Sequence, residues 1–287
     1  MKRAALLQVL QATLVTAIIL WSLGPIIVGL LTSFSTETDV RSVPPIWVPP
    51  NPSLTAYQEL FQGTGAASTI GGTTTQEGAF GRSVWNSVTL TTVSTIGILL
   101  VAICAAYAFT RLRFNGNKVF YWALLATMII PVFTIVVTLF QLMASAHLID
   151  TTVGISLVLI ATQTPLATWQ FHNQLRDLSP EPEQAALIDG CTRWQAFVRV
   201  VIPQMSSGIA AVSAILMLAV WGEFLIPLLL TSTLRSKPVT VLITEFIGKY
   251  TTNYPLLAAA GIIALLPPAI VVLVLNRRIR GMLSGAS

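Results

Sequence analysis

Long runs of apolar residues, separated by polar segments, dominate the chain. An α-helix needs roughly 20 apolar residues to cross the hydrocarbon core of a bilayer. Six runs meet this requirement, and they cover about residues 9–32, 84–110, 119–143, 153–171, 207–230 and 255–275. The pattern therefore predicts an all-α membrane protein with six transmembrane helices. Prolines inside several runs predict kinks or breaks; they are Pro131, Pro165, Pro227, Pro267 and Pro268.

The polar segments divide the chain into four parts. Residues 1–32 hold a basic end and the first run, which is longer than the roughly 7 to 15 apolar residues of a cleaved signal peptide. We expect an extracytoplasmic loop at 33–83, a five-helix transmembrane core at 84–276 and a tail at 277–287. The first loop begins Pro-rich, whereas its second part, 62–82, is Gly/Thr-rich and resembles an insertion.

Basic residues set the predicted orientation, because Lys and Arg accumulate on the cytoplasmic side of membrane proteins. With the N-terminus inside, eleven of the sixteen Lys and Arg residues are cytoplasmic: Lys2, Arg3, Arg111, Arg113, Lys118, Arg176, Arg193, Arg199, Arg277, Arg278 and Arg280. The others are Arg41, Arg82, Arg235, Lys237 and Lys249. Both termini are therefore predicted to be cytoplasmic.

Composition excludes several classes of function. Only 9% of the residues are charged, against roughly 25% in soluble domains. The net charge of +5 does not indicate nucleic-acid binding, because the basic residues are scattered and form no stripe. Cys104 and Cys191 have no metal-ligand or disulfide spacing, and His147 and His172 have no companion ligands. We expect no metal, no nucleic-acid partner and no catalytic residue in this chain.

The loop after the fourth run concentrates charge and helix-capping residues. Ser179 is a good N-cap, and Pro180 suits the first position of a short helix. Gly190 would end that helix, because glycine accepts the left-handed conformation that closes helices. Thr192 begins a second helix with a capping box, and Pro203 is expected to end it. The loop is thus predicted to be a stiff helix, turn and helix.

Two interpretations of this loop stay open on local features alone. It could be an ordinary amphipathic connector lying on the membrane surface. It could also dock into a groove of a partner protein, because Ala185, Ala186 and Gly190 keep one face small. Trp194 and Phe197 give the second helix a bulky face.

The loop also carries a longer pattern that favours docking. The residues Gln184, Ala185, Ala186, Gly190, Val200, Ile202 and Pro203 follow the spacing Glu-Ala-Ala, three residues, Gly, nine residues, hydrophobic-x-hydrophobic-Pro. In this the chain resembles the permease subunits of bacterial ATP-binding-cassette importers for carbohydrates, in particular the smaller maltose-type permease. Residues 86–116, 221–230 and 276–287 resemble the same family. Gln184 stands where the signature has glutamate, and Glu183, just before it, could substitute after a small helix rotation.

The resemblance implies a fold and a set of partners. The fold would be the type I (MetI-like) permease bundle in a bacterial inner membrane, with a cytoplasmic coupling helix. The partners would be a second homologous permease, an ATPase dimer and an extracytoplasmic sugar-binding protein. The chain lacks a phosphate-binding loop, so ATP and Mg would be bound by the ATPases. The resemblance places ATPase coupling in 179–204, at Glu183, Gln184, Ala185, Ala186, Asp189, Gly190, Trp194 and Phe197.

Two further sites lie toward the predicted outer side. Glu223 is the only carboxylate well inside a predicted span, and such residues are functional candidates because burying their charge in lipid is costly. We consider Glu223 and Trp221 for the translocation path; alternatively, Glu223 faces water or a local hydrogen-bond donor. The loop 231–254 is either an interfacial helix or, by resemblance, a contact for the binding protein, through Arg235, Lys237, Thr244 and Glu245.

The favoured function is therefore a non-catalytic permease subunit of an ATP-driven importer for a disaccharide, an oligosaccharide or a sugar-like osmolyte. The main alternative is a secondary transporter driven by an ion gradient, which would be expected to carry intramembrane acids or broken helices at an ion site. An intramembrane enzyme would need a paired nucleophile and base, and the two histidines do not supply one.

Overall fold

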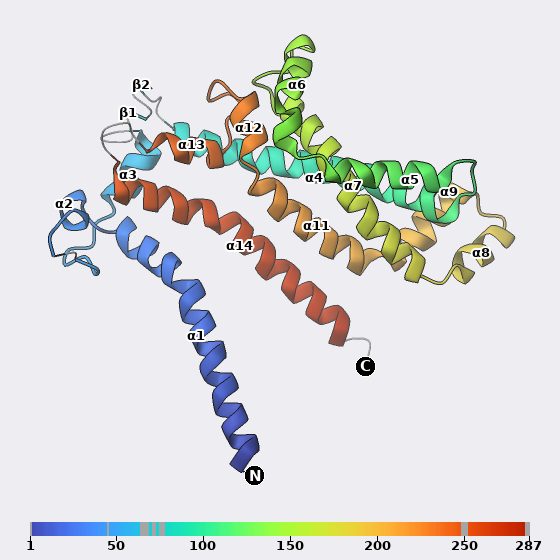
Figure 1. Cartoon of the computed structure of the whole chain (residues 1–287), viewed down its shortest axis with the longest axis horizontal. Helices are drawn as coiled ribbons and strands as arrows, with labels where there is room; N and C mark the ends of the chain where they lie inside the picture. The colour runs from blue at the N-terminus through green and yellow to red at the C-terminus, as the bar shows by residue number, and fades with distance from the viewer. Residues whose placement is uncertain are drawn as a thin grey trace. The chain divides into compact units, whose positions relative to one another are not determined.

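A computed structural model describes residues 2–44, 46–63, 69–70, 73–74, 78–247 and 252–284. Parts of the Gly/Thr-rich segment 62–82 (64–68, 71–72 and 75–77), and Lys249, lie outside this part of the chain. The helices are α1 (Lys2–Ser33), α2 (Glu37–Val40), α3 (Thr55–Gln62), α4 (Ala79–Arg111), α5 (Asn117–Ala126), η2 (Thr127–Ile129), α6 (Val132–Ser145), α7 (Thr152–Asp177), α8 (Glu181–Ile188), α9 (Arg193–Ala196), η3 (Phe197–Val201), α10 (Ile202–Gln204), α11 (Ser206–Trp221), α12 (Leu225–Leu230), α13 (Val239–Glu245) and α14 (Tyr254–Ser284) (Figure 1). Two short strands, β1 (Thr69–Ile70) and β2 (Thr73–Thr74), pair antiparallel.

The long helices agree with the predicted spans. Within the described residues, four helices are long and apolar enough to cross a membrane, or up to six if each of two bent helix pairs is one span. The four are α1, α4, α7 and α14. They correspond to the first, second, fourth and sixth apolar runs, which confirms the predicted all-α membrane fold.

The third and fifth predicted spans are each divided into two helices. In the third, α5 and η2 meet α6 at a bend of 100°. Pro131 causes the break, because the residue before a proline is disfavoured in helical conformation, and Ile130 is extended with ψ at 115°. In the fifth, α11 ends at Trp221 and α12 begins at Leu225. This break is not the second bent pair, which joins Arg193–Gln204 to α11. By contrast, Pro165 lies within a continuous helix, α7.

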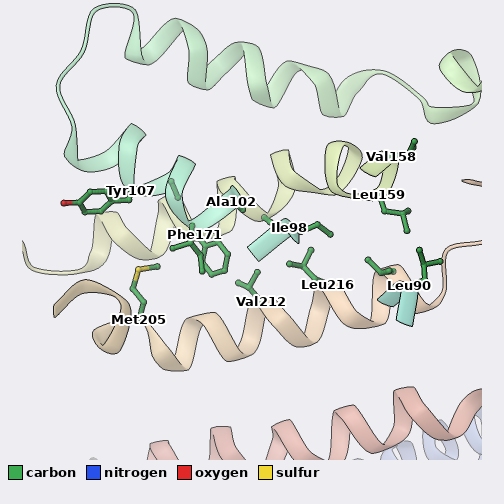
Figure 2. Packing of buried hydrophobic residues seen from close by; sticks show 14 of the residues in the cluster. Leu90, Ile98, Ala102, Tyr107, Val158, Leu159, Phe171, Met205, Val212 and Leu216 are labelled. Atoms are coloured by element: carbon green, nitrogen blue, oxygen red, sulfur yellow. The ribbon is translucent and has the colours of Figure 1, made fainter. Parts of the chain in front are cut away.

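The chain forms two compact units, 1–82 with 242–266, and 83–241 with 267–287. The second unit has a core formed by α4, α7 and α11, in which Ile98, Leu159 and Leu216 are at most 1% exposed (Figure 2). Lipid is as apolar as these side chains, so helix association in a membrane depends on close packing. At Gly97 a Cβ atom would lie 2.4 Å from the Ile160 side chain, so glycine lets α4 approach α7.

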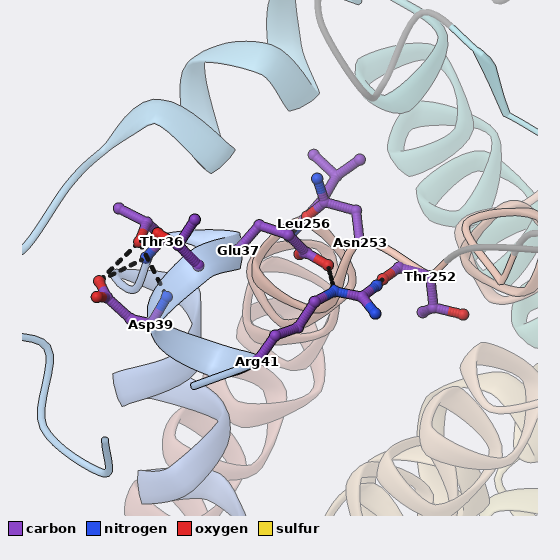
Figure 3. A network of polar contacts seen from close by, with 8 residues as sticks. Thr36, Glu37, Asp39, Arg41, Thr252, Asn253 and Leu256 are labelled. Atoms are coloured by element: carbon purple, nitrogen blue, oxygen red, sulfur yellow. Dashed lines mark hydrogen bonds and ion pairs between the residues drawn. The ribbon is translucent and has the colours of Figure 1, made fainter. Parts of the chain in front are cut away.

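The first unit contains a polar network beside the end of α1. Thr36 caps α2 in a capping box with Asp39. Arg41 pairs with Glu37 and donates from Nη2 to the Thr252 carbonyl at 2.9 Å (Figure 3). The network ties the start of the first loop to the residues just before α14.

Candidate functional site

The charged loop has the predicted helix, turn and helix. Gly190 has a φ of +91° and follows α8, so the glycine turn is confirmed. Thr192 and Gln195 form the predicted capping box at the start of α9. The first helix begins one residue later than predicted, because Pro180 occupies the cap position and Ser179 Oγ accepts from the Glu181 N–H at 3.3 Å.

The sequence predicted that Pro203 ends the second helix, but the helix continues through this residue. The helix continues from α9 through a wider π-helical turn, η3, and through α10 to Gln204. In the wider turn the Ile202 N–H donates to the Phe197 carbonyl. A helix can carry a proline when a local π turn relieves the clash with the preceding turn. The loop then meets α11 at a bend of 76°.

Glu183 fastens the loop to a membrane helix. Its side chain is buried, and its Oε1 accepts from the Tyr107 hydroxyl at 2.6 Å. Its Oε2 lies 3.1 Å from Arg111 Nε in an ion pair. Arg111 also donates from Nη2 to the Leu178 carbonyl at 2.9 Å. Tyr107 and Arg111 belong to the end of α4, so α8 is held against α4 by one buried carboxylate.

The predicted coupling residues divide into an inner and an outer set. Glu183 and Phe197 are buried, and the Phe197 ring lies 4.5 Å from that of Tyr107, between centroids. The residues that face outward are Gln184, Ala185, Asp189, Gly190 and Trp194, while Ala186 is half-buried. The outer set forms the surface that this loop offers to another molecule.

Sequence reasoning missed Ile188, which is 85% exposed. It lies four residues after Gln184, and residues at this spacing share one face of a helix. The spacing therefore could have revealed it. Tyr107 and Arg111 were missed as well, and no local signal marks them, because Tyr107 is 76 residues from Glu183 along the chain.

Glu223 lies in the break between α11 and α12. Its carboxylate accepts from the Ile226 N–H at 3.5 Å, and its carbonyl accepts from the Thr240 hydroxyl at 3.2 Å. Glu223 therefore has local hydrogen-bond donors at the start of α12, and both it and Trp221 are half-buried. Trp221 lines an apolar cavity of about 260 Å³ between α4, α11 and Pro267.

Asp150, which sequence reasoning did not select, organises the segment after α12. Its Oδ1 accepts from the Ser232 and Thr233 N–H groups at 3.2 Å and from Ser236 Oγ at 2.8 Å. Burial acts to raise the pKa of this carboxyl, but the hydrogen bonds from Thr233, Ser236 and Ser232 outweigh burial and lower the pKa below its ordinary value. The charged carboxylate thus holds 232–236 in one conformation.

The four predicted binding-protein contacts are placed as follows. In the second unit, Arg235 is exposed and Lys237 half-buried. In the first unit, Thr244 is exposed and Glu245 half-buried. The part of the chain that the structure describes holds no group of three or more metal-ligating side chains.

Comparison with known proteins decides the family. Residues 97–281 match the family of binding-protein-dependent transport system inner membrane components. The chain belongs to this family. It is therefore a multi-pass inner-membrane permease component of a transport system that depends on a binding protein.

Individual relatives agree with this assignment. The chain is 27% identical to SmoH, the sulfoquinovosyl glycerol transport permease of Agrobacterium fabrum, over 90% of the chain and 85% of SmoH. It is 31% identical to NgcG, the diacetylchitobiose uptake permease of Streptomyces coelicolor, over 71% of the chain and 68% of NgcG. Its fold matches a bacterial ABC transporter for the polysaccharide alginate with a TM-score of 0.80 and 19% identity, over 96% of the chain and 98% of that chain.

Proposed function

We propose that this permease forms half of the translocation path of an ATP-driven importer for a sugar. The observation that carries the proposal is the α8–α9 loop, which presents an exposed face and is fastened to α4 through Glu183. A loop that only connected two spans would have no need of this buried attachment. A loop that transmits force between an ATPase and the membrane helices does need it.

The exposed face of α8 would dock into the ATPase. Gln184 and Ile188 lie on one side of the helix, and both are exposed. When ATP and Mg bring the ATPase subunits together, α8 would move with the docked surface. Because Glu183 joins α8 to α4, the movement would pass to the bundle and favour one of two states, inward-open or outward-open.

The family and the relatives support the proposed solute and the remaining proposed partners. The named relatives carry sulfoquinovosyl glycerol and diacetylchitobiose, which supports a sugar-like solute. A second homologous permease would complete the path, and the sugar-loaded binding protein would contact Arg235, Lys237, Thr244 and Glu245. In the proposed arrangement, both termini would lie in the cytoplasm.

The test is purification of the tagged chain from its own membranes in mild detergent, followed by mass identification of the bound proteins. We expect an ATPase and a second permease in the complex, and ATP-dependent sugar uptake after reconstitution with the binding protein. The complex without ATP serves as the control. Uptake by the purified chain alone, driven by an ion gradient, would contradict the proposal and support a secondary transporter.

A further inference from the structure

A hollow with three basic side chains lies beside the α8–α9 loop. It has a volume of about 990 Å³ and is formed by the end of α4, the turn into α5, the start of α5 and the end of α7. Arg113, Lys118 and Arg176 line it, and its lining contains no carboxylate. All three basic residues are exposed, and within the described residues none belongs to an ion pair. The hollow is thus open to an anion.

The backbone at the start of α5 adds to the attraction for an anion. Gly116 occupies the cap position with φ at +86°, and no side chain caps the helix. The Asn117 side chain donates from Nδ2 backward to the Phe109 and Leu112 carbonyls at 3.1 and 3.0 Å. The first N–H groups of a helix attract anions through their free hydrogens and the helix dipole. The Asn117 N–H donates to the Phe114 carbonyl at 3.3 Å, which leaves the N–H groups of Lys118 and Val119, and both residues line the hollow.

Apolar side chains in the lining of the hollow favour a lipid over a soluble anion as its ligand. Val119 and Trp122 line the hollow on α5, and they are 71% and 67% exposed. Tryptophan is typical of the level at which headgroups meet acyl chains. A free phosphate ion has no apolar part for these side chains to contact, whereas a phospholipid has both a phosphate and acyl chains. His172, which also lines the hollow, is hydrogen-bonded through its Nδ1 to Thr110 at 2.9 Å.

We propose that the hollow binds the headgroup of an anionic phospholipid. The phosphate would lie among Arg113, Lys118 and Arg176, and an acyl chain would extend along α5. Basic pockets between transmembrane helices on the cytoplasmic side are suited to anionic headgroups. The proposal rests on the membrane location of the chain and on its predicted orientation, and it is independent of the solute carried.

The experiment is native mass spectrometry of the purified complex titrated with dioleoylphosphatidylglycerol or dioleoylphosphatidylcholine. Each cation near a lipid surface is worth roughly a fivefold change in affinity. The variant R113Q/K118Q/R176Q should therefore bind phosphatidylglycerol about 100-fold more weakly, with little change for phosphatidylcholine. R113K/R176K keeps the charges and should retain the lipid. R199Q removes an exposed cation outside the hollow and is the matched control.

Three outcomes would overturn the proposal. One is equal retention of phosphatidylglycerol by the wild type and the triple variant. Another is displacement of the lipid from the wild type by millimolar inorganic phosphate, which would identify a site for a soluble anion. The third is loss of the ATPase from the triple variant with lipid retention unchanged, which would identify a protein-docking surface. The single variant K118Q, with a fivefold expected effect, keeps the test decisive if the triple variant does not fold.

Discussion

At the scale of single residues, the attachment of the α8–α9 loop depends on the buried carboxylate of Glu183. The Arg111 side chain beside it is only 14% exposed. Removing one partner of a buried ion pair leaves the other charge buried without compensation, which costs roughly 3–5 kcal/mol. Tyr107 adds a charge-assisted hydrogen bond to the same carboxylate. This position is therefore more sensitive than the exposed positions on the same helix.

Glu183→Gln should lower ATP-coupled uptake at least fivefold and lower the unfolding temperature of the purified complex. The neutral amide keeps the shape of the side chain but leaves the charge of Arg111 unpaired. Uptake by proteoliposomes and thermal unfolding are the two measurements. Asp177→Asn is the matched control, because Asp177 is an exposed carboxylate at the end of α7, outside α8. Wild-type uptake and unfolding in Glu183→Gln would show that the attachment carries no force.

Asp150→Asn should loosen the segment 232–236 and destabilise the protein by about 2 kcal/mol, the strength of hydrogen bonds to a charged group. Because the folded pKa of Asp150 is lowered, its stabilisation is fully present above the ordinary value near pH 4. It is lost as the pH falls through the lower folded pKa. The difference in unfolding temperature between wild type and variant should therefore be constant from pH 5 to 7 and shrink in acid. The same pH dependence for Asp177→Asn, an exposed control, would contradict this account.

At the scale of elements, the apolar runs predicted which segments are helical, and the structure confirms them, because the apolar pattern is local. The bend of 100° at Pro131 was predicted only as a kink or break. Its size depends on what α6 packs against, which the local pattern does not contain. The burial of Glu183 could not be predicted for a similar reason, since Tyr107 and Arg111 approach it only after folding. By contrast, the caps at Thr192 and Gly190 depend on near neighbours and were predicted.

The entry into α7 offers a test of close packing. A Cβ atom at Gly154 would lie 2.2 Å from the Leu148 carbonyl oxygen, which is backbone and has little freedom to move. Gly154→Ala should therefore displace the turn that carries Asp150 and lower the unfolding temperature by several degrees, as expected for roughly 1–3 kcal/mol of overpacking. Gly81→Ala, at a helical glycine with nothing within 4 Å, should be neutral or slightly stabilising. Equal unfolding temperatures for the two variants would show that the turn adjusts without cost.

At the scale of the whole molecule, the α8–α9 loop must keep its shape while it transmits movement. Gly190 sets the angle between the two helices with a φ of +91°, and no atom lies within 4 Å of its missing Cβ. No neighbouring side chain would obstruct a substitution there. Any cost would therefore come from the positive φ of the backbone. Such a conformation is costly for a β-branched residue and less so for asparagine, which is enriched at positive φ.

Gly190→Val should therefore lower ATP-coupled uptake at least fivefold, while Gly190→Asn should keep most of it. Both variants should insert into the membrane at wild-type levels, because the substitution lies between helices and outside the predicted spans. Sugar uptake and ATP hydrolysis are measured on the same proteoliposomes. If the loop transmits force, the valine variant should hydrolyse ATP with less transport for each ATP consumed.

Equal loss in the valine and asparagine variants would mean that any side chain obstructs the docked partner, and that backbone shape is not the cause. Wild-type uptake in both would remove the coupling role from this turn.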